Sequence, residues 1–394
     1  MTEHPFLAAR APAPSSHLDW PFYEPRHREV WSWAEAWCAA HPHIDHDEVD
    51  VTCRALVRSM GETPLLQLMD PYSALGYSIR AIGLVRERLA QHSGLADFAF
   101  AMQGLGLGPV VDRGSDAQKL RWGGAVARGE AIAAFALTEP DAGSDAANLR
   151  MDARQVGDEW LLAGEKTYIS NGTIADFFTV FARTGGEGHA GLSCFLVPAG
   201  TAGLSVAERI EVIAPHPLAR LRFDEVRLPL DALIGERGDG FAIAMRTLNR
   251  FRVSVGAAAL GFARRALSEA LEFSTGRRLG SGMLADNAVT QQNLAEMAMM
   301  IDASALLIAR AAWEQDTERH TGQRRTAAMA KLHATEAAQK VIDMAVQLHG
   351  GLGVTRGTRV EELYREVRAL RIYEGASEVQ RQIIARDLLK EQRG

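Results

Sequence analysis

The chain has 394 residues, of which 47% are apolar and 23% are charged, and its formal net charge is −6. This length and composition are typical of a soluble globular protein of two or three domains. The small acidic excess gives no support to nucleic-acid binding or to binding of anionic membranes through bulk charge. No apolar run approaches the roughly 20 residues of a membrane-spanning helix, so we expect no membrane insertion.

The first residues, "MTEHPFLAARAPAPSS", lack the apolar core of a secretion signal, and we interpret residues 1–19 as a flexible arm. Three cysteines are odd in number and far apart, which is typical of a protein in the reducing cytoplasm. The segment "HPHIDHDE" at 41–48 has several metal-ligating side chains but no second ligand group. We interpret it as a solvated loop and predict no metal site.

Residues 20–130 carry apolar side chains at helical spacing, for example Ile79, Ile82 and Val85. In "GSDAQKLRW", Ser115 followed three positions later by Gln118 predicts a capping box at a helix start. We therefore predict an N-terminal helical domain. "GLGLGP" within it lacks both the G-x-G-x-x-G spacing and a strand–turn–helix frame, so we reject it as a dinucleotide-binding loop.

Residues 131–236 differ in character, because the strand-length runs "IAAFALT", "FFTVFA" and "LSCFLVP" are separated by turn residues. Such short strands predict a small antiparallel β-barrel or sandwich. Residues 237–394 are again helical and predict a four-helix bundle. Its long helices are expected at 241–275, 286–317 and 325–348. The fold class is therefore α+β and mostly α.

Two segments of the middle domain could carry chemistry, "FALTEPDAGSD" at 135–145 and "EKTYISNG" at 165–172. In the first, Pro140 favours an extended Glu139 and Gly143 frees the backbone to turn. Such a turn exposes amides and hydroxyls that can bind a planar heterocycle or a phosphate. Taken singly, each segment is better explained as an ordinary turn of a β domain.

A third segment, "RIYEGASEVQRQIIAR", places Glu374 directly before Gly375. A helix is predicted to begin just after this pair, with Ser377 and Glu378 in its first turn. Glu374 lies outside that turn, beside a glycine that allows another molecule to approach the backbone. On its own, this pattern is better explained as an ordinary exposed carboxylate near a helix start.

The motifs "TEPDAGSD", "GEKTYISNG", "LHGGLG" and "IYEGAS", in this order in a helix–sheet–helix chain, resemble the acyl-CoA dehydrogenase family of flavoproteins. The resemblance implies an FAD-dependent enzyme that desaturates an acyl-CoA thioester between its α and β carbons. It implies that Glu374 is the base that removes the α proton, and that its amide donates to the thioester oxygen. It also implies electron-transfer flavoprotein as a partner and a homotetramer with FAD at a subunit interface.

The resemblance also implies contacts residue by residue. FAD contacts fall on Leu137, Thr138, Ser144, Tyr168, Ile169, Ser170, Arg277, Gln347, Leu348, Gly350, Gly351, Ala376, Ser377 and Glu378. Substrate contacts fall on Ser144, Asn249, Arg252 and Gly375.

The chain departs from the family pattern at several of these positions. Tyr168 stands where many relatives have Trp, Ser170 where Thr is commoner, and Asn249 where Asp is usual. The segment "GRRLGSG" at 276–282 lacks the Phe of the R-x-x-F-G pattern that relatives usually show. Two other readings remain: an oxygen-using flavin oxidase or monooxygenase of the same fold, and a non-catalytic scaffold that lacks flavin.

Overall fold

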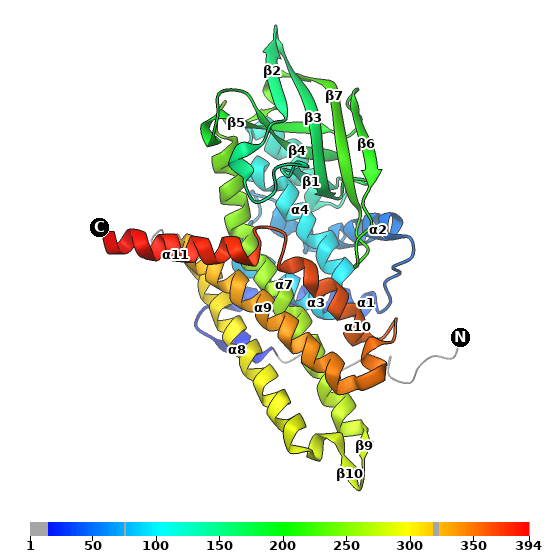
Figure 1. The fold of residues 1–394 in the computed structure, drawn as a ribbon. Coiled ribbons are helices and arrows are strands. Elements are labelled where there is room, and N and C mark those ends of the chain that lie inside the picture. The colour runs from blue at the N-terminus through cyan, green and yellow to red at the C-terminus, as the bar shows by residue number, and fades with distance from the viewer. Residues whose placement is uncertain (1–14, 75, 318–322, 394) are drawn as a thin grey trace.

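A computed structural model describes residues 15–74, 76–317 and 323–393. The chain forms helices, then a sheet, then helices again, and Figure 1 shows the sheet at one end of the molecule with the long helices extending away from it. The predicted fold class, mostly α with a middle β domain, is confirmed.

The N-terminal part is helical throughout. Its elements are η1 (Ser16–Asp19), α1 (Pro25–Ala40), α2 (Val49–Gly61), η2 (Leu66–Met69), α3 (Ile79–His92), α4 (Gly94–Arg113), α5 (Asp116–Gln118), η3 (Lys119–Gly123) and α6 (Gly124–Ala127). The predicted capping box is confirmed, because Ser115 N donates to Gln118 Oε1 at 3.0 Å and Gln118 N donates to Ser115 Oγ at 3.2 Å.

The flexible arm predicted for residues 1–19 is wrong for its last four residues, while residues 1–14 lie outside the described part. Ser16–Asp19 form a 3-10 turn in which His17 and Leu18 are buried. Leu18 packs with Trp31 and Leu84 in a small apolar cluster, and this contact fixes the segment.

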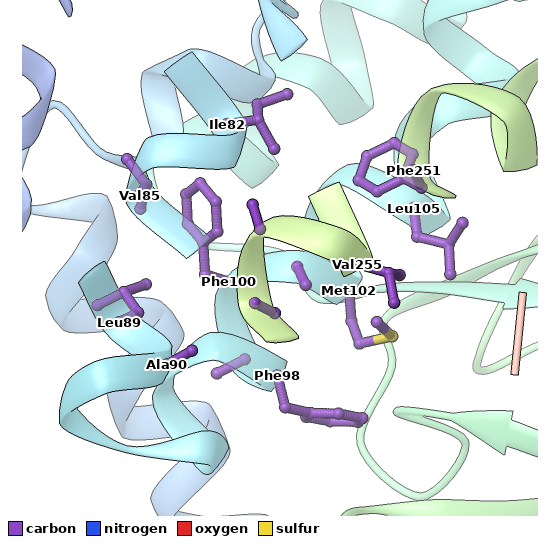
Figure 2. Close-up of a cluster of buried hydrophobic side chains, with 14 of the residues drawn as sticks. Ile82, Val85, Leu89, Ala90, Phe98, Phe100, Met102, Leu105, Phe251 and Val255 are labelled. Atoms are coloured by element: carbon purple, nitrogen blue, oxygen red, sulfur yellow. The ribbon is translucent and has the colours of Figure 1, made fainter. Parts of the chain in front are cut away.

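Helix α4 corrects the expectation that no segment reaches membrane-spanning length. By length and composition it could cross a bilayer, but 89% of its most apolar window is buried inside the protein. It is a core helix, and "GLGLGP" lies in its interior, so the rejection of that motif as a loop is confirmed. Figure 2 shows side chains of α3, α4 and α7 (Gly240–Gly276) meeting in one buried cluster, including Phe100, Met102 and Val255.

The β domain holds one sheet of eight strands in the order β6-β7-β3-β2-β4-β5-β8, with β1 beside β4. The strands are β1 (Ala133–Ala136), β2 (Asp152–Val156), β3 (Glu159–Ser170), β4 (Phe177–Arg183), β5 (Leu192–Pro198), β6 (Leu204–Arg209), β7 (Leu218–Pro229) and β8 (Leu233–Ile234). The predicted antiparallel pairing fails for β1 with β4 and for β2 with β4, which are parallel. Parallel neighbours need a long crossover, and the β2–β3 hairpin lies between β1 and β4 in the chain.

The C-terminal part begins with α7, whose 37 residues run the length of the bundle. After it come β9 (Arg278–Leu279), β10 (Gly282–Met283), η7 (Leu284–Asp286), α8 (Ala288–Asp316), α9 (Gln323–His349), η8 (Gly350–Val354), α10 (Arg359–Leu370) and α11 (Ser377–Arg393). The three predicted long helices are thus confirmed as α7, α8 and α9. Figure 1 shows the β9–β10 hairpin at the tip farthest from the sheet, and α11 crossing the other end of the bundle.

Candidate active site

The loop between α10 and α11 carries Glu374 and Gly375. Both have left-handed backbone angles, with φ of +52° and +91°. This region suits glycine but costs other residues about 1–2 kcal/mol, so the surrounding structure must impose it on Glu374. A Cβ at Gly375 would lie 2.6 Å from Gln380 Nε2, so this position accepts only glycine without rearrangement.

The Glu374 side chain points into the protein. Both of its carboxylate oxygens are buried, and neither has a hydrogen-bond partner in the described part of the chain. Burial raises the pKa of Glu374 above its usual value, while the positive charges of Arg86, Lys331 and Arg252 act in the opposite direction. A buried carboxylate without partners is costly to maintain, and such a group marks a candidate functional site.

Helix α7 supplies Arg252 to this loop. Arg252 is buried, and its Nε donates to the Glu374 carbonyl oxygen at 3.4 Å. Burial lowers its pKa to about 10, although the Glu374 carboxylate counteracts this shift. Asn249 lies almost one turn earlier on the same helix, half-buried, with a buried Oδ1 that has no partner among the described residues.

Two residues that hold this loop were missed by sequence reasoning, Lys331 on α9 and Gln380 on α11. Lys331 Nζ donates to the carbonyl oxygens of Tyr373 and Gly375, each at 2.6 Å. Gln380 Nε2 donates to Gly375 O at 2.8 Å. The available signal for Lys331 is its place on the apolar face of α9, in helical register with buried alanines at 327, 330, 334 and 338.

The start of α11 contains the other predicted contacts of this segment. Ser377 is buried, and its hydroxyl donates to Glu336 Oε1 at 2.5 Å, so that hydroxyl already has a partner within the chain. Ala376 is half-buried and Glu378 is exposed.

The β domain contributes the turn after β1. Leu137 is buried and Thr138 half-buried, and the Thr138 carbonyl accepts from Thr167 N on β3 at 2.9 Å. Beneath the turn, the buried Lys166 Nζ donates to Leu137 O at 2.9 Å and to Glu139 Oε1 at 2.8 Å. Burial lowers the pKa of Lys166 to about 8, and the Glu139 carboxylate partly offsets that shift.

The turn is also fixed from its other side, because Glu139 accepts from the backbone N–H groups of Arg150 and Met151 at 2.7 and 3.0 Å. Ser144 lies in the same turn and is exposed to solvent. The segment "TEPDAGSD" is therefore fixed at Glu139, whose backbone also pairs with that of the buried Ala142, while residues 143–145 are exposed.

The end of β3 lies beside this turn. Ile169 is buried, whereas Tyr168 is 62% exposed and has a φ of +54°. A register shift between Lys166 and Ile169 directs the Tyr168 ring away from the sheet. Ser170 follows, half-buried. An exposed aromatic ring on a bulged strand end is suited to cover a flat ligand.

Helix α4 connects the two halves of this site. Its Gln103 Oε1 accepts from Ala133 N at the start of β1, at 3.1 Å. One residue later, Gly104 packs so closely on α7 that a Cβ there would lie 2.6 Å from the Phe251 ring. Phe251 immediately precedes Arg252, so α4 packs against both the β domain and the helix that reaches Glu374.

The remaining predicted contacts lie far from Glu374. Arg277 is exposed just beyond α7. Gln347 and Leu348 lie at the end of α9, and Gly350 and Gly351 follow in η8. Phe273 and His349 stack with ring centroids 4.3 Å apart, which places these two helix ends side by side. The structure thus brings these residues together with one another but not with Glu374.

Comparison with known proteins identifies this arrangement. Residues 134–226 match the family model "Acyl-CoA dehydrogenase, middle domain", and residues 238–389 match "Acyl-CoA dehydrogenase, C-terminal domain". The chain belongs to the acyl-CoA dehydrogenase family. Members of this family are FAD-dependent oxidoreductases that act on CH–CH groups, so the resemblance inferred from the motifs is confirmed.

Individual acyl-CoA dehydrogenases and related proteins show how far the similarity extends. The mitochondrial short-chain specific acyl-CoA dehydrogenase of Bos taurus is 37% identical, over 86% of this chain and 83% of its own. The 3-(aryl)acrylate reductase of Clostridium sporogenes is 35% identical, over 87% of this chain and 93% of its own. Among solved structures, butyryl-CoA dehydrogenase from Megasphaera elsdenii has a TM-score of 0.85 at 28% identity, covering 93% of this chain and 98% of its own.

The residues present fit the acyl-CoA dehydrogenase cofactor. The exposed Tyr168 ring and the turn around Leu137 and Thr138 offer a flat surface and backbone polar groups for the FAD ring system. Arg277 is free to reach a diphosphate, because the described residues around it provide it with no ion pair.

Proposed function

We propose that this enzyme converts an acyl-CoA thioester to the 2-enoyl-CoA, with Glu374 as the base that takes the α proton. The observation that carries the proposal is that both carboxylate oxygens of Glu374 are buried and have no hydrogen-bond partner in the described part of the chain. A raised pKa makes this carboxylate a stronger base toward the weakly acidic α C–H. Bound FAD supplies the acceptor for the hydride that leaves the β carbon.

The protein's own groups would also stabilise charge on the thioester oxygen. The Glu374 N–H has no hydrogen-bond partner within the described residues, so it can donate to that oxygen. The substrate would therefore be bound and deprotonated by one residue, through its backbone and its side chain.

We assign the flavin contacts of this site to the β domain. Leu137 and Thr138 would hold the edge of the FAD ring, Tyr168 would cover its face, and Ser170 would donate a hydrogen bond to it. Lys166 keeps the Leu137 carbonyl in place by a direct hydrogen bond of 2.9 Å. We assign Ser144, on the exposed turn, to the CoA part of the substrate.

We further propose a homotetramer, or at least a dimer. Arg277 follows Arg252 by about 37 Å along the axis of α7, at 1.5 Å per residue, so both cannot serve one flavin within a chain. Arg277 and the end of α9 would instead contact the FAD of a second copy. Light scattering that finds a flavin-loaded monomer would exclude this arrangement.

For the electrons, we propose a soluble electron-transfer flavoprotein as acceptor, a place in fatty acid metabolism and a cytoplasmic location. The three cysteines are all buried and free, which supports a reducing compartment. Rapid turnover with purified electron-transfer flavoprotein and slow reoxidation in air are expected. Rapid reoxidation in air would favour an oxidase instead.

The test of the reaction is anaerobic bleaching of the flavin by a panel of acyl-CoA thioesters, from butyryl-CoA to palmitoyl-CoA and including branched and aryl acyl groups. Purified protein should be yellow, and at least one thioester should bleach it stoichiometrically with formation of the 2-enoyl-CoA. Colourless protein that does not take up FAD would support the scaffold reading. Yellow protein that no thioester bleaches would refute the proposed reaction.

A further inference from the structure

The loop that carries Glu374 is held by a buried lysine from another helix. Lys331 on α9 is 1% exposed, and its ammonium donates to the carbonyl oxygens of Tyr373 and Gly375, the residues on either side of Glu374. Both distances are 2.6 Å, which is short for an N–H···O bond and typical of a charge-assisted one. No ion pair within the described chain accounts for this buried charge.

The carbonyl oxygen of Glu374, between Tyr373 and Gly375 in the chain, also accepts hydrogen bonds from residues outside the loop. The Glu374 carbonyl accepts from Arg252 Nε and from Gln380 Nε2, each at 3.4 Å. These bonds are longer than the two that Lys331 makes, so Lys331 is the strongest of the three donors. The loop has no regular secondary structure, and hydrogen bonds from side chains of three helices hold its backbone instead.

The bond to Tyr373 O has a direct consequence for the N–H of Glu374. The carbonyl of residue 373 and the N–H of residue 374 belong to one planar trans peptide, so they point in opposite directions. Fixing the carbonyl on Lys331 therefore directs the N–H away from α9. An ammonium at the oxygen end also polarises the peptide and strengthens the N–H as a donor.

We propose that Lys331 is a positioning residue that orients and polarises the Glu374 N–H toward the carbonyl oxygen of the acyl thioester. The inference rests on the proposed function, because it assigns that N–H to the thioester. The ammonium also fixes the left-handed backbone of Glu374 from both sides, so the N–H and the carboxylate are placed together. In the described chain the Lys331 ammonium donates only to the two loop carbonyls, so its role is exerted through this backbone.

If Lys331 orients the Glu374 N–H, its loss should weaken binding only of ligands that have a thioester carbonyl. If it only stabilises the fold, its loss should affect all ligands alike. Two ligands distinguish these roles. The ligands are the 2-enoyl-CoA product of whichever thioester bleaches the wild-type flavin best, and the S-alkyl-CoA thioether of the same chain length. The thioether keeps the CoA and the chain but has no carbonyl oxygen to accept a hydrogen bond. Neither ligand reduces the flavin, so both dissociation constants can be measured by perturbation of the flavin spectrum in the FAD-loaded enzyme.

Lys331→Met should weaken binding of the enoyl thioester by 10-fold or more and change binding of the thioether by less than 2-fold. Flavin reduction by the saturated thioester should slow by about 10- to 100-fold, since removing a direct donor to an oxyanion costs about 10²–10³. Lys390→Met, which removes an exposed lysine from α11, serves as the matched control and should leave all three values unchanged.

Lys331→Gln provides the test if the Met variant does not fold with FAD, because the side-chain amide keeps N–H donors without the charge. It should show the same preference for loss of the thioester, at a smaller magnitude. Equal losses for thioester and thioether, or no loss for either in a yellow variant, would overturn the role of Lys331. A wild-type enzyme that no acyl-CoA bleaches would instead refute the proposed function, before any variant is made, and this inference with it.

Discussion

Replacement of Glu374 by Gln is the most direct test of the site. The amide keeps the size and polarity of the side chain but lacks an oxygen that can take a proton. The carboxylate has no hydrogen-bond partner in the described structure, so this change breaks no internal bond, and FAD and acyl-CoA should still bind. Loss of a general base lowers the rate by about 10²–10⁴, equivalent to about 3–5.5 kcal/mol of the barrier.

The assay is anaerobic stopped-flow reduction of the flavin by saturating acyl-CoA. Glu374→Asp withdraws the carboxylate by one methylene group, and a misplacement of this order can cost about 10²-fold. Glu391→Gln is the matched control, because the Glu391 side chain is 60% exposed and lies near the end of α11. Reduction of Glu374→Gln at near wild-type rates would show that the base lies elsewhere.

The rate of flavin reduction by acyl-CoA should also depend on pH, and the direction of that dependence follows from the burial of Glu374. Glu374 acts only when ionised, and burial raises its pKa above the ordinary value of 4.5. The rate of flavin reduction should therefore fall as the pH drops, with the midpoint above pH 4.5. Glu374→Gln should lack this acid limb. A wild-type rate that stays constant down to pH 4.5 would contradict the role of burial.

Three further changes test the cofactor side. Ser170→Ala should slow flavin reduction more than it weakens FAD binding, since a hydrogen bond to developing charge matters most in the transition state; Ser170→Thr should be nearly neutral, and equal reduction rates for wild type and the Ala variant would remove Ser170 from the site. Arg277→Ala should weaken FAD retention by about 1.5–3 kcal/mol, measured by occupancy after dialysis, and unchanged occupancy would reassign the contact to Arg278. Lys166→Met should lower the free energy of unfolding by about 3–5 kcal/mol, because it leaves the Glu139 carboxylate buried without its cation. The double variant Lys166→Met/Glu139→Gln removes that carboxylate and should recover part of the lost stability. A double variant as unstable as Lys166→Met alone would contradict this explanation.

Local signals were sufficient for most of the fold. The apolar repeats predicted α7, α8 and α9 to within a few residues, and Ser115 with Gln118 was enough to locate a helix start. These features depend on residues three or four positions apart, which periodicity and capping rules describe. The parallel pairing of β1 with β4 involves residues 44 apart in register, Ala133 with Phe177, and no local pattern encodes it.

The site was only partly accessible from the sequence. The motif around Glu374 suggested a base, but nothing local reveals that its carboxylate is buried or that three helices supply donors to its loop. Lys331 precedes Gly375 by more than forty residues and contacts only backbone carbonyls, so no side-chain pairing in the sequence indicates it. Lys166 was likewise missed, since its partners are a carbonyl and a carboxylate on another strand end.

The left-handed backbone at Glu374 also affects how this enzyme can be engineered. Among the residues described here, positive φ occurs at five non-glycine positions, and two of them, Tyr168 and Glu374, belong to the candidate site. Glycine at position 374 would relieve the backbone strain and remove a buried carboxylate, so it is expected to raise the melting temperature. A directed-evolution programme that selects for heat resistance alone would therefore favour loss of the base, and each round needs a screen for turnover as well.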